Sequence, residues 1–108
     1  MPVILKRDGR KQAFSREKLL AGLRLACRKR PVTEEQLEDV VVRVERELSR
    51  RADREVPTHE LGDIAMAALR DLDAVAYLRF ASVYRAFETP EDFLAVVGPL
   101  LPSVRGAP

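Results

Sequence analysis

The stretch VILKRDGRKQAF, residues 3–14, predicts a β-hairpin at the start of the chain. Two short runs flank the dipeptide Asp8-Gly9, which is typical of a two-residue type I′ turn because both of its positions need a positive φ. A two-stranded sheet is not stable alone in water, so we expect this hairpin to lie over the rest of the domain.

The predicted turn places like charges opposite each other. Pairing the strands about a two-residue turn sets Arg7 against Arg10 and Lys6 against Lys11. Each such pair destabilises a hairpin by a few tenths to about 1 kcal/mol. The pairs become favourable if a polyphosphate lies between them, because arginine and lysine both bind phosphate oxygens. The hairpin therefore indicates an anion site. The alternative, ordinary solvated surface charges, stays open.

Neighbouring residues extend the anion hypothesis. Lys18 lies outside the apolar stripe of the helix that follows the hairpin, and the N–H groups at the start of that helix attract anions. Ile4, together with Leu19 or Leu25, would form an apolar slot for a purine base. The pattern is consistent with a ligand that combines a flat apolar group with phosphates.

The remainder of the chain predicts helices. The first ends near Lys29 and the last near Gly98-Pro99, while REVP, residues 54–57, indicates an extended connector. The fourth helix, AVAYLRFASVYRAF at residues 74–87, is apolar on nearly all sides, which predicts a central position. The fold class is α+β and mostly α, a hairpin with the option of a short third strand over four to five helices. The predicted N-caps are Ser15, Thr33, Thr58, Asp73 and Thr89.

Positive charge is concentrated in the first part of the chain. Residues 1–30 carry ten Lys or Arg and two acids, a net charge of +8, whereas the remainder carries −6. We therefore expect any anionic partner to bind this first part. This charge also supports an alternative function, a basic helical module that binds nucleic acid. A further alternative is a pure protein-interaction module with a vestigial nucleotide site.

Several classes of protein are disfavoured. The single cysteine, Cys27, excludes an internal disulfide and a cysteine-rich zinc site within this chain, so we expect no zinc here. The single histidine, His59, leaves no histidine metal cluster and no Ser-His-Asp set. Since no apolar run has the length of a membrane span and no signal peptide is visible, we expect a cytoplasmic protein without membrane or enzymatic function.

Three segments carry a resemblance to a known family. The segment VILKRDGRKQAFSREKLLAGL resembles the start of an ATP-cone, the nucleotide-sensing domain of ribonucleotide reductases and of the bacterial repressor of their genes, the NrdR family. KRPVTEEQLE and REVPTHELGDIAMAALRDLDAVAYLRFASVYRAFE resemble the repressor branch more specifically. The resemblance covers roughly residues 3–94. It predicts an ATP-cone over residues 1–94, with residues 95–108 as the end of the last helix and a frayed tail.

The resemblance implies a regulatory ligand, ATP or dATP, bound beneath the hairpin. Gln12-Ala13 stands where family members commonly show Glu-Pro, which implies an altered preference between the two nucleotides. By position, phosphates would be held by Lys6, Arg7 and Lys18, the base or sugar would contact Ile4 and Leu19, and Thr58 and Tyr84 would line the site.

The resemblance also implies partners. In the family, the bound nucleotide sets the oligomeric state, and the oligomer decides whether operator DNA is bound. We therefore expect nucleotide-dependent self-association of this chain. Because the family binds DNA through a four-cysteine zinc ribbon, operator binding would need a zinc ribbon supplied elsewhere.

Overall fold

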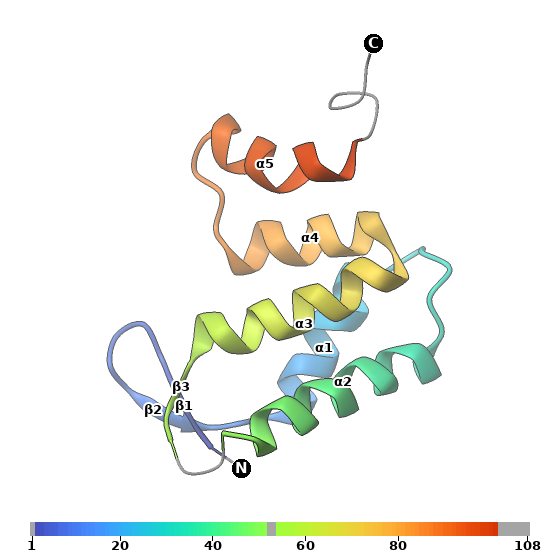
Figure 1. The fold of residues 1–108 in the computed structure, drawn as a ribbon. Helices are drawn as coiled ribbons and strands as arrows, with labels where there is room; N and C mark the ends of the chain where they lie inside the picture. The colour runs from blue at the N-terminus through green and yellow to red at the C-terminus, as the bar shows by residue number, and fades with distance from the viewer. Residues whose placement is uncertain (1, 52–53, 102–108) are drawn as a thin grey trace.

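A computed structural model describes residues 2–51 and 54–101, in which a small sheet lies at one end of a stack of helices (Figure 1). The part of the predicted tail at residues 102–108 lies outside this description. The elements in chain order are β1 (Val3–Leu5), β2 (Lys11–Ala13), α1 (Arg16–Ala26), α2 (Glu34–Ser49), β3 (Val56–Pro57), α3 (Thr58–Leu72), α4 (Ala74–Tyr84), α5 (Pro90–Val97) and a 3₁₀ turn, η1 (Gly98–Leu100).

The sheet has the order β2-β1-β3, so the optional third strand is present. β1 pairs with β2 antiparallel, and it pairs with β3 parallel, with Ile4 opposite Val56. Both of these side chains are buried. The parallel pair ties the hairpin to the segment that leads into α3, and it thereby fixes the hairpin over the helices.

The predicted hairpin register is wrong by one residue. Ile4 lies opposite Gln12, and the turn is a three-residue loop in which the Gly9 N–H donates to the Lys6 carbonyl at 3.0 Å. Gly9 has a φ of 88°, the left-handed conformation that follows a type I turn in such loops. The Asp8 carboxylate accepts from the Arg10 N–H at 3.0 Å and stabilises the wider loop.

The new register removes both predicted like-charge pairs. Arg10 forms an ion pair with Asp8 at 2.6 Å, and Lys11 forms one with Glu55 at 2.7 Å. A shift of one residue changes which face of a strand a side chain occupies. Gln12 consequently lies opposite Ile4.

Four of the five predicted N-caps are confirmed. Ser15, Thr33, Asp73 and Thr89 each accept a backbone N–H at the start of a helix. Thr58 does not, because α3 begins one residue earlier than predicted, directly after strand β3. Thr58 is therefore the first residue of the helix, and its hydroxyl is not needed as a cap.

The helices α1, α2, α3 and α4 form a closed ring of contacts around the core. One cluster of buried side chains lies among these four helices, and a second lies between the sheet, α2 and α3. The apolar stripe of α2 is buried throughout and consists of Leu37, Val40, Val41, Val44 and Leu48. The largest fully buried side chains are Leu23, Leu48, Leu69, Val41, Val44 and Val56.

The central position predicted for the fourth helix is wrong. Only Ala76 and Ala81 of α4 are buried, and Val83 is 78% exposed. One side of α4 packs against α1 and α3, while α5 lies on its outer side (Figure 1). Because α5 has eight residues and α4 has eleven, α5 covers only part of that apolar surface.

None of the helices in residues 2–51 and 54–101 has the length and hydropathy of a membrane span.

Candidate functional site

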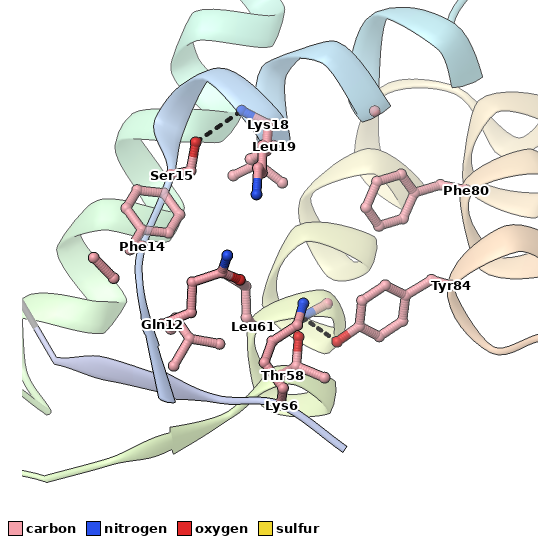
Figure 2. Close-up of a pocket in the computed structure, with 14 residues that line it drawn as sticks. Lys6, Gln12, Phe14, Ser15, Lys18, Leu19, Thr58, Leu61, Phe80 and Tyr84 are labelled. Carbon is pink, nitrogen blue, oxygen red and sulfur yellow. Dashed lines mark hydrogen bonds between the residues drawn. The ribbon is translucent and has the colours of Figure 1, made fainter. Parts of the chain in front are cut away.

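A pocket of about 200 Å³ lies where the hairpin, α1, α3 and α4 meet (Figure 2). Both α1 and α3 begin at its rim, so the positive ends of two helix dipoles face it. Its lining residues are Ile4, Lys6, Gln12, Ala13, Phe14, Ser15, Lys18, Leu19, Gly22, Thr58, Leu61, Gly62, Phe80 and Tyr84.

Two lysines and one amide supply the long polar side chains of this pocket. Lys6 extends from the end of β1 and Lys18 from the first turn of α1, and Figure 2 shows them pointing toward each other across the pocket. Within the described ranges, neither lysine forms an ion pair, whereas the nearby Arg10 and Lys11 each bind an acid. The pocket therefore holds two cations that are available to an anion.

The remaining walls are mostly apolar. Ile4 and Leu19 approach from the hairpin and α1, and Phe14, Leu61 and Phe80 complete the surface. An apolar cavity with a few converging polar groups is the usual form of a small-molecule site. This pocket suits a ligand with a flat apolar part and a negatively charged part.

Tyr84, the last residue of α4, forms one wall. Its ring stacks on Phe80 with centroids 5.9 Å apart and an interplanar angle of 6°. Its hydroxyl accepts a hydrogen bond from the Gly62 N–H at 3.2 Å. Helix α3 approaches the ring so closely that a Cβ on Gly62 would overlap ring carbons. The position of Tyr84 thus depends on a glycine in the adjacent helix.

Burial raises the pKa of Tyr84 above its ordinary value, and hydrogen bonds with Thr58 and Gly62 partly oppose the rise. The phenol is therefore neutral at physiological pH, with an O–H that can donate to a ligand.

A second, more open depression of about 440 Å³ continues from the pocket on the hairpin side. Lys6, Thr58 and Tyr84 line both hollows, so they are adjacent. Arg7 lies in this depression and not in the pocket, and its Nη2 donates to the Tyr84 carbonyl at 3.1 Å.

Six of the seven predicted site residues line the one pocket, and Arg7 lies at its edge. Leu25, the alternative partner for a base, lies in another groove between α1 and α4 and is 57% exposed. The six residues are Ile4, Lys6, Lys18, Leu19, Thr58 and Tyr84.

Sequence reasoning missed several lining residues. Phe80 could have been found, because it lies four residues before Tyr84 and so shares its helical face. Phe14, Leu61 and Gly62 carry no comparable local signal. Their places follow from how the hairpin and α3 pack against each other.

The reactive side chains outside the pocket form no second candidate site in the described part of the chain. Cys27 is buried among apolar side chains, and this burial raises the pKa of its thiol. His59 is exposed. In the part of the chain that the structure describes, no group of three or more His, Cys, Asp or Glu side chains is arranged to hold a metal ion.

Comparisons with known proteins show which family the chain is similar to. A family model described as "ATP cone domain" matches residues 2–90. The chain is 52% identical over 93 residues to the transcriptional repressor NrdR of Myxococcus xanthus, covering 86% of this chain and 55% of that protein. For NrdR of Thermobifida fusca the identity is 54% over 91 residues, with 84% and 60% covered.

A third relative, NrdR of Sorangium cellulosum, is 46% identical over 101 residues, which cover 94% of this chain and 66% of that protein. The chain thus spans between 55% and 66% of the length of these three relatives.

Proposed function

The chain belongs to the ATP cone domain family, and we propose that it senses adenine nucleotides by binding ATP or dATP in the pocket beneath the hairpin. The observation that carries the proposal is the pair Lys6 and Lys18. These cations lack acidic partners in the described chain and extend into a mostly apolar pocket at the start of two helices. A phosphate chain would supply the missing negative charge.

Each part of the nucleotide has a suitable surface. Lys6 and Lys18 would hold the phosphates, with Arg7 reaching them from the adjacent depression. The base or sugar would lie against Ile4 and Leu19. The hydroxyls of Thr58 and Tyr84 border both hollows and would complete the site.

The role would be regulatory and not catalytic. The lining offers cations, hydroxyls, an amide and apolar surface, which bind a nucleotide but supply no acidic group, histidine or cysteine for bond cleavage. Binding would change the relative stability of alternative arrangements of hairpin and helices, which is how a ligand shifts a conformational equilibrium.

Gln12 is the residue to examine for nucleotide preference. Its amide extends into the pocket beside Ile4 and presents both a donor and an acceptor (Figure 2). A group of this kind would contact the sugar or the base. We expect substitution of Gln12 to alter the ratio of ATP to dATP affinity.

The relatives suggest the wider setting. Since they are transcriptional repressors, this chain would serve as the nucleotide-sensing part of a cytoplasmic regulator of ribonucleotide reductase genes. Bound nucleotide would set its self-association, and a zinc ribbon supplied elsewhere would bind operator DNA. The division at residue 94 remains a prediction. Size-exclusion chromatography with and without dATP tests the association.

The alternative of a basic nucleic-acid module loses support once the charges are paired. Arg16 binds Glu38 and Glu45, and Arg24 binds Glu34. Arg10, Lys11 and Arg30 pair with Asp8, Glu55 and Asp73, so five of the ten cations in residues 1–30 are engaged by acids. A nucleic-acid binder needs unpaired cations, because the number of phosphates that it neutralises sets its affinity and salt dependence.

Isothermal titration calorimetry of the full chain with ATP and dATP tests the proposal. We expect submillimolar affinity for both and a loss of roughly tenfold or more for Lys6→Ala, equivalent to about 1.4 kcal/mol. Lys11→Ala is the matched control, because Lys11 belongs to the same hairpin but pairs with Glu55 and does not line the pocket. No heat with either nucleotide would overturn the proposal.

A further inference from the structure

Arg7 links the hairpin loop to the far end of α4. Its Nη2 donates to the carbonyl of Tyr84 at 3.1 Å, across 77 residues of sequence. The other arginine of this hairpin, Arg10, forms an ion pair with Asp8 instead. In the described chain Arg7 has no carboxylate partner, so its contact with α4 is the one that fixes its position.

The acceptor of this hydrogen bond belongs to a helix end. The last carbonyls of a helix have no partner within the helix, and a cation there is favourable. Two residues after Tyr84, Ala86 has a φ of 50°, a conformation that costs energy for a residue other than glycine. The chain then enters α5, which packs on α4. The Arg7 contact therefore lies where the path to α5 is set.

The guanidinium can serve two partners at once. It has five N–H donors in a rigid plane, and the Tyr84 carbonyl occupies one of them. Arg7 itself lines the depression that Lys6 and Thr58 also line, next to the pocket. A phosphate held by Lys6 could accept from Arg7 without displacing the Tyr84 carbonyl.

We propose that Arg7 is a positioning residue that bridges a bound phosphate chain to the Tyr84 carbonyl, so that nucleotide binding stabilises the end of α4 and the start of α5. The inference rests on the proposed nucleotide site. It explains how a nucleotide in the pocket would stabilise α5, a helix that does not line the pocket. The Tyr84 ring is already fixed by Gly62 and Phe80, so a fixed carbonyl completes the restraint of this residue.

Hydrogen–deuterium exchange of the full chain tests the bridge. We expect saturating ATP to slow amide exchange in residues 80–97 of the wild type by roughly threefold to tenfold, the range for one added hydrogen bond. Arg7→Ala should lose this slowing. Arg7→Lys should lose most of it, because lysine keeps the charge but offers one nitrogen instead of a planar fork. Lys11→Ala is the matched control, because Lys11 belongs to the same hairpin but lines neither hollow, and it should retain the slowing.

Two outcomes separate this inference from the proposed function. If calorimetry shows ATP binding but Arg7→Ala keeps the full slowing, the bridge is wrong and the nucleotide site stands. If ATP does not bind, the proposed function fails, and inorganic triphosphate becomes the probe. Slowing by triphosphate in the wild type but not in Arg7→Ala supports the bridge, and its absence overturns the bridge as well.

Discussion

Gly62 provides the space that the Tyr84 ring occupies. The ring lies on the backbone of α3, and the Gly62 N–H donates to its hydroxyl at 3.2 Å. Any side chain at position 62 would overlap the ring. Tyr84 in turn lines both the pocket and the depression beside it, so one glycine sets the shape of the candidate site.

We expect Gly62→Ala to lower the free energy of unfolding by about 1–3 kcal/mol, because the ring must move away from the added methyl group. Gly22→Ala is the matched control, since a Cβ there would meet Phe80 at an ordinary distance of 3.6 Å. Alanine in a helix is otherwise favoured over glycine by about 0.5–1 kcal/mol. Urea unfolding of both variants checks this, and equal stability of the two would contradict the close contact.

The raised pKa of Tyr84 predicts a loss of stability at high pH. A phenol whose pKa is higher in the folded state stabilises the fold fully below its ordinary value of 10. This contribution is lost as the pH rises through the folded pKa. We expect the stability difference between wild type and Tyr84→Phe to shrink above pH 10, measured by urea unfolding. A difference that stays constant up to the folded pKa would argue against burial of the hydroxyl.

The lowered pKa of Asp73 predicts a loss of stability at low pH. Arg30 donates two hydrogen bonds of 2.9 Å to its carboxylate, which also caps α4 through the Ala76 N–H. These partners lower the pKa of Asp73, the Arg30 hydrogen bond most of all, so its stabilisation is present above the ordinary value of 3.8 and is lost as the pH falls through the folded pKa.

We therefore expect Asp73→Ala to cost about 1 kcal/mol or more at pH 7 through the lost cap. The cost should decrease in acid. Asp39→Ala is the control, because Asp39 lies exposed on α2 with no ion pair among the described residues. Chemical unfolding at pH 7 and pH 3 measures both, and a cost that is equal at the two pH values would show that the carboxylate charge is unimportant.

The division of the pocket into charged and apolar parts predicts separable effects. We expect Lys18→Ala to weaken ATP binding by roughly tenfold or more and to leave adenosine binding unchanged, because adenosine lacks the phosphates. Bound ATP should also raise the stability of the wild type by about 2.7 kcal/mol at a hundredfold excess over Kd. Thermal unfolding with each ligand provides the measurement. If Lys18→Ala weakened the binding of ATP and adenosine equally, Lys18 would contact the base and not the phosphates.

Local signals in the sequence predict much of this fold. The caps Thr33 and Thr89 and the stripe of α2 follow from spacing alone, because they depend on residues three or four apart. The hairpin register did not follow, since Asp8-Gly9 suits both a two-residue turn and the observed three-residue loop. The exposure of α4 depends on how little of it α5 covers, which is a tertiary property.

The residues of the candidate site could likewise be predicted only in part from local sequence. The positions of Lys6 and Lys18 could be predicted, because the hairpin and the first helix are adjacent in sequence and carry many more basic than acidic residues. Gly62 could not, since its importance comes from a contact with a residue 22 positions away. The comparisons confirm the family resemblance, which predicted Thr58 and Tyr84 as lining residues. Both line the pocket, and their contact with a nucleotide stays a prediction.

The proposed nucleotide site places ATP between Lys6 and Lys18. Two-dimensional ¹H–¹⁵N NMR of the full chain, titrated with ATP, tests it most directly. We expect the largest shifts at the amides of Lys6, Lys18, Thr58 and Gly62, around one pocket. Shifts concentrated on α2, or no shifts at millimolar ATP, would contradict it.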